Sequence, residues 1–437
     1  MKCWLKITPL ALFLLLINGC SRTEKRGKII HRTEKVEKVV RLLTREVSLG
    51  KRNPGIIVWS LSVSPDSKHV AYVAKRGNKQ FVVVDGKEGK GYDGIGGLTF
   101  SPDGKCVAYV AKYGNKQFVV IDGKEGKGYD EILEYSLIFS PESKHVAYVA
   151  KRGNKQFVVV DGKEGKRYDG IVGLTFSPDG KCVAYVAKHG NKQFVVIDGK
   201  EGKRYDEISR LIFSPNSKYV AYVAKYGNKW VVVVDGKEGK EYDEILENTL
   251  ILSPDGEHVA YVAVNGNKLL VVVDGKEGKE YDGIYEGTPI FSPDGKHVAY
   301  VAVNGDKILV VVDGKEGKEY DGIGVGTLTF SPDSKHIAYV AKRGDKVFVV
   351  VDGKEGKEYD GILEGTLTFS PNSKHVAYVA GRGKKWFVVV DGVEGKEYYD
   401  GFLRGSKLVF DSPKSFHGLA KRGDKLLRVE VEIETTP

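Results

Sequence analysis

The segment FSPDGKHVAYVAVNGDKILVVVDGKEGKEYDGI runs from Phe291 to Ile323 and contains the pattern that decides the fold. Short runs of β-branched, aromatic and other apolar residues are separated by Gly, Asn and Asp. Runs of this kind are typical of short strands, and no stretch has helical periodicity of useful length. We predict four strands per unit, of the types GTLTF, HVAYVA, FVVVD and KEYDGI.

The residues between these runs have the chemistry of tight turns. In Ser292-Pro293-Asp294-Gly295, proline presets φ for the first central position of a type I turn. Gly305 marks the hairpin tip between the second and third strands, and DGKEG supplies two glycines for the next connection. The Asp of this phrase is predicted to be a turn former. A calcium site is not expected, because the alternating acids of an EF-hand are missing.

The same unit recurs along the chain. Its Ser-Pro dipeptide begins, at intervals of 37 or 39 residues, at Ser64, Ser101, Ser140, Ser177, Ser214, Ser253, Ser292, Ser331 and Ser370. A period of about 40 residues is the signature of β-propeller blades and of some helical solenoids. The strand pattern within each unit favours the propeller, an all-β fold.

The core FSPDGKHVAYVA, followed by a VVVDG strand, resembles the repeat of TolB-type, WD-repeat-like β-propellers. The resemblance extends from about residue 53 to the C-terminus, which defines a propeller domain over residues 53–437. It implies a periplasmic or cell-surface scaffold that binds proteins, peptidoglycan-associated partners or glycans, and it implies no reaction by itself. No Gly-x-Ser-x-Gly nucleophile motif follows the repeats, so a prolyl-peptidase-like enzyme is not supported.

The two ends of the array suggest how it could close. Nine clear units are followed by a degenerate tenth, from Lys407 to Glu434, which stops before a fourth strand. NPGIIVWSLSVSPDS from Asn53 aligns with YDGIGVGTLTFSPDS from Tyr320, so the chain is expected to begin with a lone fourth strand. We predict a single propeller of about ten four-stranded blades, closed by pairing the two ends. Two five-bladed rings and an open arc are the alternatives.

The charge of the chain is concentrated near its N-terminus. The net charge is +10, and Ser21–Gly50 contributes +5 of it from nine basic and four acidic residues. Lys2 and Lys6 add two more, so the repeat region is nearly neutral. This distribution removes the main support for nucleic-acid binding.

The first residues have the pattern of a bacterial lipoprotein signal, which we assign to residues 1–19. A basic start is followed by the apolar run Leu10–Ile17 and then by Asn18-Gly19-Cys20. The run is too short for a spanning helix. The ending resembles a lipobox, which implies that Cys20 becomes acylated and anchors the chain in the cell envelope. Ser21 at the next position favours the outer membrane, and an ordinary cleaved signal peptide is the alternative.

Residues 20–52 are expected to form a basic tether. A stripe of apolar residues at helical spacing predicts a short amphipathic helix that Thr33 could cap: Val36, Val39, Val40, Leu43 and Val47. This helix has two interpretations of equal weight. It either docks on the edge of the propeller or lies on anionic headgroups, where each basic residue contributes about 1 kcal/mol.

His and Cys residues recur at one position of the repeat and could suggest a metal site; we call them the belt. Six histidines share one repeat position, which Cys106, Cys182 and Tyr219 occupy in other units: His69, His145, His258, His297, His336 and His375. Sheets pack roughly 10 Å apart, too far for equivalent residues to share an ion or for Cys106 and Cys182 to form a disulfide. We therefore predict neither a metal nor a cofactor, and we assign the belt to packing between blades.

The variable positions indicate where a ligand would bind. In the predicted strand order, the connections between fourth and first strands share one face with the hairpin tips between second and third strands. The variable Tyr and Arg residues there define a candidate binding face: Arg76, Tyr113, Tyr135, Arg152, Arg210, Tyr226, Tyr285, Arg343 and Arg382. Tyr and Arg are enriched at binding hot spots. The opposite face displays DGKEGK, which is expected to be a uniform solvated rim, and neutral drift is the alternative explanation of the variable loops.

Three functions fit these observations. The leading hypothesis is a non-catalytic, lipid-anchored scaffold of the cell envelope that binds a protein or an envelope polymer. The sequence predicts no particular oligomeric state. The second is a propeller-based glycan lyase or hydrolase, although near-identical blades offer no visible set of unlike catalytic groups. The third is a structural surface array of repeats that has no specific ligand.

We predict that Cys20 carries acyl chains, because the apolar core and Ile17-Asn18-Gly19-Cys20 form a lipoprotein signal. Mass spectrometry of the mature N-terminus should detect this modification. A Cys20→Ser variant should leave the membrane fraction. A mature chain that begins elsewhere without lipid, or a membrane-bound variant, would refute the assignment.

Overall fold

A computed structural model describes residue 57 and residues 60–396, 398–402, 407–423 and 425–433. The predicted signal peptide, Cys20 and the tether therefore lie outside the described residues. The elements of the described part are 45 strands, arranged in ten antiparallel sheets that we number in chain order. In this part of the chain, no helix has the length and apolarity needed to cross a bilayer.

Each sheet is one repeat unit whose strands follow one another from the inside of the molecule to the outside. The second and third strands form a tight hairpin in every sheet. The second strands are β2 (Val70–Arg76), β6 (Val107–Tyr113), β11 (Val146–Arg152), β15 (Val183–His189), β19 (Val220–Tyr226), β24 (Val259–Asn265), β29 (Val298–Asn304), β34 (Ile337–Arg343), β39 (Val376–Arg382) and β44 (Ser415–Arg422). The third strands are β3 (Lys79–Val84), β7 (Lys116–Ile121), β12 (Lys155–Val160), β16 (Lys192–Ile197), β20 (Lys229–Val234), β25 (Lys268–Val273), β30 (Lys307–Val312), β35 (Lys346–Val351), β40 (Lys385–Val390) and β45 (Lys425–Glu432).

The first strand of each sheet explains the two repeat lengths. It is continuous, with a bulge, in three sheets that belong to 37-residue units: β5 (Gly94–Phe100), β14 (Gly170–Phe176) and β18 (Glu207–Phe213). Two extra residues split it in the 39-residue units: β9 (Glu131–Ile132) and β10 (Ile138–Phe139), β22 (Glu244–Ile245) and β23 (Ile251–Leu252), β27 (Gly283–Ile284) and β28 (Ile290–Phe291), β32 (Gly322–Ile323) and β33 (Thr329–Phe330), β37 (Gly361–Ile362) and β38 (Thr368–Phe369). The terminal sheets have β1 (Ser62–Val63), and β42 (Gly401–Phe402) with β43 (Val409–Ser412).

The fourth strands are short and lie on the outside. They are β4 (Lys87–Glu88), β8 (Lys124–Glu125), β13 (Lys163–Glu164), β17 (Lys200–Glu201), β21 (Lys237–Glu238), β26 (Lys276–Glu277), β31 (Lys315–Tyr320), β36 (Lys354–Glu355) and β41 (Val393–Glu394). In most sheets the tyrosine of the same phrase extends this strand by a single bridge, as Tyr281 does with Leu269. The predicted division into four strands is therefore confirmed, with one correction at the end of the phrase.

That correction concerns the Gly-Ile or Glu-Ile pair that was assigned to the fourth strand. Gly283 and Ile284 pair with Val303 and Ala302 of β29, so they begin the first strand of the next sheet. The phrase VDGKEGKEYDGI therefore spans two sheets, ending one and starting its neighbour. Its Asp-Gly turn is as predicted: Asp274 has φ 49° and Gly275 φ 76°, which is the left-handed pair of a type I′ hairpin.

The hydrophobic core lies between neighbouring sheets. Between sheets 1 and 2, for example, Val82 and Tyr92 pack against Phe100, Val107 and Tyr109. Tyr92 is 1% exposed, and its ring meets that of Tyr109 edge to face at 6.2 Å. The same tyrosine pair recurs between most neighbouring sheets, and edge-to-face pairs add about 0.5–1.5 kcal/mol to the burial of their area.

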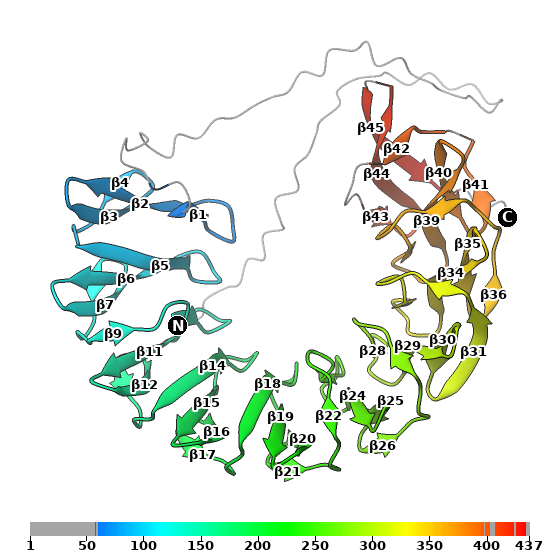
Figure 1. Ribbon diagram of the computed structural model, residues 1–437. Coiled ribbons are helices and arrows are strands. Elements are labelled where there is room, and N and C mark those ends of the chain that lie inside the picture. The colour runs from blue at the N-terminus through cyan, green and yellow to red at the C-terminus, as the bar shows by residue number, and fades with distance from the viewer. Residues whose placement is uncertain (1–56, 58–59, 397, 403–406, 424, 434–437) are drawn as a thin grey trace, which may run out of the picture.

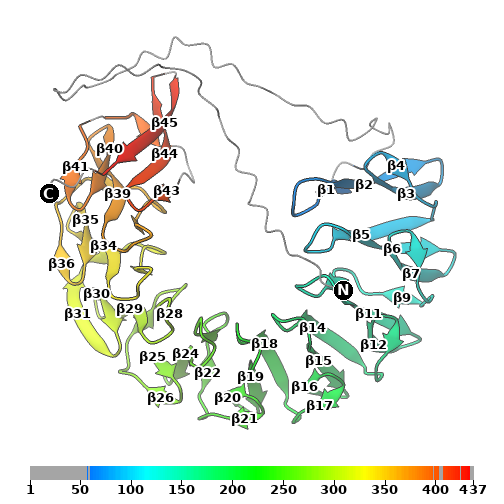
Figure 2. The same ribbon diagram turned by 180° about the vertical axis from the view of Figure 1, so that it is seen from behind.

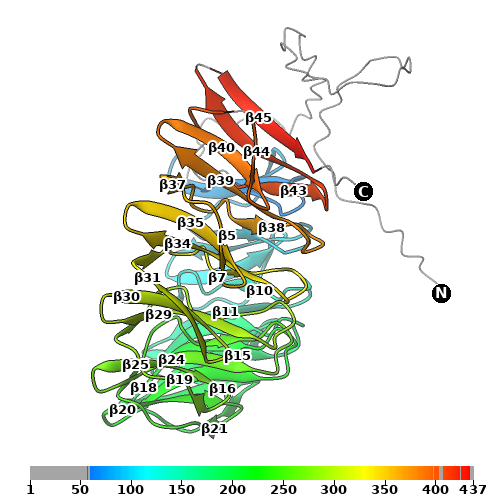
Figure 3. The same cartoon turned by 90° about the vertical axis from the view of Figure 1, so that its right-hand side faces the viewer.

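The ten sheets stand side by side along an open arc. The first strands line its concave side and the fourth strands its convex side (Figure 1). Sheet 1 and sheet 10 form the two ends, which stay apart when the molecule is seen from behind (Figure 2). From the side, the sheets are seen stacked one on another along the arc (Figure 3).

The N-terminal end of the array differs from the predicted closure. The amide of Ile57 donates to the carbonyl of Val73 in β2 at 2.8 Å, as Gly324 does to Val340 in sheet 8. The alignment of the first residues with residues 320–334 is thus correct at Ile57, but this residue bonds to the second strand of sheet 1, ahead of β1. It is not part of a fourth strand for the last sheet, and residues 53–56 and 58 lie outside the described part.

The C-terminal end has a surface unlike those of the other sheets. As predicted, sheet 10 has three strand positions, and no fourth strand follows β45 in the described residues. Phe416, Val429 and Val431 pack toward sheet 9, so the alternate residues of β44 and β45 face away from it. Sheet 9 carries Ala377, Val379, Val388 and Val390 at the equivalent outward positions, where sheet 10 carries His417, Leu419, Arg428 and Glu430. A polar outer face is typical of the terminal unit of an open array.

We predict that Arg428→Val combined with Glu430→Val will make the protein self-associate. The two changes restore the apolar outward pattern of the internal sheets, and an exposed apolar patch favours association. Sedimentation velocity over a range of concentrations measures the effect. A control with Lys315→Val and Lys354→Val adds the same side chains on the convex side. Equal behaviour of the two variants would contradict a capping role for sheet 10.

Candidate functional site

The nine predicted binding residues lie in two separate places. Six of them end second strands at hairpin tips on one rim of the arc: Arg76, Tyr113, Arg152, Tyr226, Arg343 and Arg382. Tyr135, Arg210 and Tyr285 lie within the first strands or between their pieces, on the concave side (Figure 1). The variable segments expected to be loops are therefore interruptions of the innermost strand.

The rim itself is held by a repeated hydrogen-bonded contact between sheets. The aspartate that follows the fourth strand accepts two hydrogen bonds. One comes from a lysine in the hairpin of its own sheet, and the other comes from a glycine amide in the hairpin of the next sheet. Asp243, for example, accepts from Lys229 Nζ at 2.6 Å and from the Gly266 amide at 2.7 Å. Both donors hold the pKa of the Asp243 carboxyl below its ordinary value, with Lys229 as the larger cause. We call this contact the aspartate latch, and it joins sheets 5 and 6.

Equivalent latches join the other internal pairs of sheets. Their aspartates, each with a lowered pKa from the same two kinds of donor, are Asp93, Asp130, Asp169, Asp206, Asp282, Asp321 and Asp360. The invariance of Tyr-Asp in the phrase therefore has a structural reason. These crossovers are fixed connections and do not vary from unit to unit as a recognition surface would.

The arginines of the hairpin tips turn back along their own sheets. Arg152 donates to Glu164 with both terminal nitrogens, at 3.1 and 3.2 Å, and its guanidinium lies 5.6 Å from the Phe157 ring centre. Arg76, Arg343 and Arg382 make the same kind of contact with Glu88, Glu355 and Glu394. These arginines are thus partly engaged within the fold.

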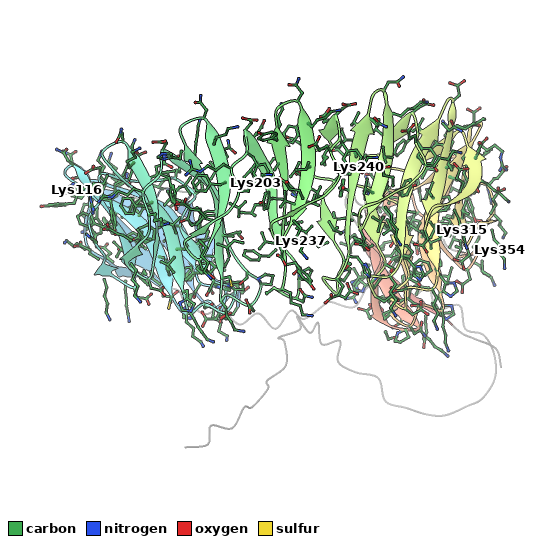
Figure 4. All side chains as sticks on the ribbon, turned by 90° about the horizontal axis from the view of Figure 1, so that it is seen from below. Lys116, Lys203, Lys237, Lys240, Lys315 and Lys354 are labelled. Atoms are coloured by element: carbon green, nitrogen blue, oxygen red, sulfur yellow. The ribbon has the colours of Figure 1, made fainter. Side chains whose placement is uncertain are left out.

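The glutamate of the repeated phrase also binds the preceding sheet. Glu164 in sheet 3 accepts from Lys127 of sheet 2 at 2.5 Å, and Lys127 and Arg152 together lower the pKa of its carboxyl. The equivalent lysine–glutamate pairs run from Lys90–Glu125 to Lys357–Glu394. The lysines of the phrase are spread along the convex side of the arc, as Lys203, Lys240 and Lys315 show (Figure 4). The expected uniform rim is therefore a seam between sheets as well as a solvated surface.

The two tyrosines of the hairpin tips contact the preceding sheet as well. Lys79 Nζ lies 4.8 Å from the ring centre of Tyr113, and Lys192 Nζ lies 5.3 Å from that of Tyr226. Both rings are more than half exposed. At exposed sites such a contact contributes about 0.5–1 kcal/mol, so these rings are only weakly held.

Three side chains on the concave side occupy a backbone conformation that disfavours them. Tyr135, Arg210 and Asn248 have φ of 59°, 52° and 63°. The equivalent residues of the other internal sheets are glycines with positive φ: Gly97, Gly173, Gly287, Gly326 and Gly365. Tyr135 is 86% exposed, and Arg210 Nη1 donates to Asn248 Oδ1 at 3.2 Å. Each non-glycine residue in this region costs on the order of 1–3 kcal/mol, a strain that is concentrated at functional sites.

We call Tyr135, Arg210, Asn248 and their exposed neighbours the concave wall. Glu134, Glu247, Glu286 and Glu364 are exposed beside the positive-φ positions, and they form no ion pair with other described residues. Two exposed valines lie at equivalent places: Val172 at the bulge of β14 in sheet 4, and Val325 between β32 and β33 in sheet 8. Tyr285, by contrast, is half-buried against the core between sheets 7 and 8 and is not available as a free ring.

Sequence reasoning missed Asn248, although a signal for it was present. Aligning the units places Asn248, Tyr135 and Arg210 at a position where most units have glycine. A glycine that recurs at one turn position indicates positive φ. Its replacement in three units therefore predicts three strained positions.

The opposite rim contains repeated grooves between sheets. The groove between sheets 6 and 7 has a volume of about 380 Å³, a floor that includes Phe291 and Tyr300, and a border that includes His258, Lys276 and Lys296. Grooves of about 600, 420 and 380 Å³ occupy equivalent places elsewhere in the arc. Because the same residue types line them, no groove is distinguished as a single specific site.

The histidine belt lies at these grooves and is used within each sheet. His258 Nδ1 lies 2.7 Å from Asp274 Oδ2, while Asp274 Oδ1 accepts from the Val259 amide at 2.9 Å. The other five belt histidines make the same contact, so packing between sheets is an incomplete account of them. Cys106 and Cys182 are free thiols, as predicted. In the described part of the chain, no group of three His, Cys, Asp or Glu residues is placed to hold a metal ion.

Comparisons with known proteins add a distant similarity. No family model matches the sequence, and no curated protein matches it. TolB from Acinetobacter baumannii is 16% identical with a TM-score of 0.26, covering 50% of this chain and 61% of its own. The β-propeller domain of the Trilobed protease from Pyrococcus furiosus, which has an open velcro topology, is 14% identical with a TM-score of 0.27, covering 59% of this chain and 93% of its own. A eukaryotic initiation factor is 14% identical with a TM-score of 0.32 over 76% of this chain and 97% of its own. The chain thus has a distant structural similarity to β-propeller proteins.

The aspartate latches predict a loss of stability in acid. A carboxyl with a lowered pKa stabilises the folded chain above its unfolded-state value, and this contribution is lost as the pH falls through the folded value. The melting temperature should therefore fall as the pH drops below about 4, the ordinary pKa of an aspartate. Asp243→Asn should weaken this dependence and speed hydrogen exchange of the Gly266 amide, whereas Asp345→Asn at an exposed tip should do neither. An acid response and an exchange rate unchanged in Asp243→Asn would contradict the latch.

Proposed function

We propose that this chain is a non-catalytic binding scaffold that holds a protein or an envelope polymer on its concave wall. The single observation that carries the proposal is the set of exposed side chains at positive φ. Tyr135, Arg210 and Asn248 stand on sheets 3, 5 and 6, within one stretch of the arc. Glycine, present in the equivalent sheets, would satisfy the backbone at lower cost. Arg210 and Asn248 also contact each other at 3.2 Å, and this proposal assigns the retention of all three side chains to contacts with a partner.

The character of the wall indicates the partner's surface. Tyr135, Val172 and Val325 expose apolar area, and four glutamates have no ion partner among the described residues. An occupant that combines apolar groups with basic or hydrogen-bond-donating groups would complement both features.

The location of this scaffold rests on the sequence of its first residues. We propose that Cys20 is lipidated and anchors the chain in the bacterial cell envelope, at the outer membrane. The propeller would then act as a fixed platform for a neighbouring envelope component. The finer architecture that fits this role is one open arc of ten blades, because the concave wall of an open arc is accessible to a long or bulky partner.

The test replaces the strained side chains with the residue that the other sheets already contain. Tyr135→Gly, Arg210→Gly and Asn248→Gly together should abolish capture of a partner from solubilised envelope. The same variant should melt at an equal or higher temperature, because the strain of positive φ is removed. Capture is measured by pull-down and stability by calorimetry, so loss of binding is separated from loss of folding.

Three outcomes would decide against the proposal. Full capture by the triple glycine variant would remove the concave wall from recognition, and a matched variant with Tyr113→Gly and Tyr226→Gly would then test the hairpin tips. No capture by the unaltered chain would favour a surface array without a ligand. Cleavage of envelope glycans by the purified chain would instead favour the lyase or hydrolase hypothesis.

A further inference from the structure

The first sheet has an apolar outward face that belongs to the regular packing surface of the array. Tyr72, Ala74, Phe81 and Val83 lie on this face of β2 and β3 and form one cluster with Val70. Their counterparts in sheet 2 include Tyr109, Ala111 and Val120, which are covered by sheet 1. In the described part of the chain, no sheet precedes sheet 1 and packs on this face.

The last sheet does not supply that partner. Each sheet covers the tyrosine face of the next one, as Val82 and Tyr92 of sheet 1 cover that of sheet 2. Sheet 10 has polar residues on its outward face, where Arg428 pairs with Glu430 at 3.1 Å, and it has no fourth strand to contribute a tyrosine in the described residues. A regular interface between sheets 10 and 1 would bury these charged groups against apolar side chains, which is unfavourable.

The outward face of sheet 1 is nevertheless buried. Tyr72, Ala74, Phe81 and Val83 are 7%, 0%, 5% and 1% exposed, and their cluster contains no described residue of another sheet. We propose that the amphipathic segment of this chain between Val36 and Val47 covers the face as an N-terminal cap. The proposal is independent of the concave wall and of its partner.

The segment has the chemistry and the position that the cap needs. Its apolar residues Val36, Val40, Leu43 and Val47 fall on one side at helical spacing. Ile57 is hydrogen-bonded to Val73 of sheet 1, and the chain between Val47 and Ile57 can extend to roughly 30 Å. This tether holds the stripe near the apolar face at a high effective concentration.

The cap explains two features of the chain together. It covers the apolar face of sheet 1 and presents a polar outer side at the N-terminal end, as sheet 10 does at the C-terminal end. Terminal caps of this kind keep repeat arrays soluble. It also decides between the two interpretations of the segment. The apolar stripe is used against sheet 1, while Lys38 and Arg45, on the opposite side of the predicted helix, are left for solvent or anionic headgroups.

The test uses the full chain in vesicle-free solution. Val40→Asp with Leu43→Asp should speed hydrogen exchange in β2 and β3 by about tenfold or more, because burial of one such side chain corresponds to more than tenfold in an equilibrium constant. The matched control, Lys38→Asp with Arg45→Asp, introduces two acids in the same segment and should leave this exchange unchanged. A photo-crosslinking residue at position 43 should label residues 70–84 of the same chain.

Three results would overturn the cap. Unchanged exchange of β2 and β3 in the Val40→Asp, Leu43→Asp variant would show that another segment covers the face. Crosslinks between chains, with a concentration-dependent dimer, would assign the face to a second copy. Crosslinks to lipid alone when anionic vesicles are added, with none to residues 70–84 in their absence, would place the segment on the membrane.

Discussion

The contact on which the rest of the structure depends is the burial of each phrase's tyrosine between two sheets. Tyr92, Tyr281 and Tyr359 are 1% exposed, and each meets the tyrosine of the next sheet edge to face. Because the phrase ends one sheet and begins its neighbour, the same twelve residues also place the aspartate latch and the lysine–glutamate pair. Each repeat of the phrase therefore forms the same interface between two sheets. The charged residues of the phrase stabilise that interface.

This economy has a consequence for function. Repeated interfaces produce grooves lined by the same residue types, which give a ligand little reason to prefer one groove along the arc. The units differ at the hairpin tips, where the arginines are bound to glutamates of their own sheets, and at the turn within the innermost strand. The concave wall at Tyr135, Arg210 and Asn248 is where difference, exposure and backbone strain coincide. The ends of the array are the other asymmetric places, and their chemistry concerns capping.

Much of the fold could be predicted from the sequence because its signals are local. The Ser-Pro turns, the Asp-Gly hairpins and the alternating apolar runs specify the sheets almost strand by strand. The boundary inside the phrase could not be placed, since Lys-Glu-Tyr and Gly-Ile are both compatible with strands and only pairing distinguishes them. Strand counting predicts a closed ring. The side chains of β45 indicate instead that sheet 10 is an end of the array. Arg428 and Glu430 alternate with Val429 and Val431, which indicates one polar face.

The candidate site was predicted only in part for a related reason. Tyr135 and Arg210 are identified by their residue type, but the variable length and content of their segments predict connections between the fourth and first strands, and the structure places them within the first strands. Arg152 and Arg343 were selected by type as well, and the structure shows them in contact with Glu164 and Glu355 of their own sheets. A list of residue types does not reveal which side chains the fold already uses.

The most direct test of the central claim is hydrogen exchange of the full chain with and without its captured partner. The account predicts protection of residues 133–137, 208–212 and 246–250 on the concave wall, with the hairpin tips and the Asp-Gly turns unchanged. Protection confined to the Asp-Gly turns and the grooves beside them would contradict it and would place recognition on the repeated phrase.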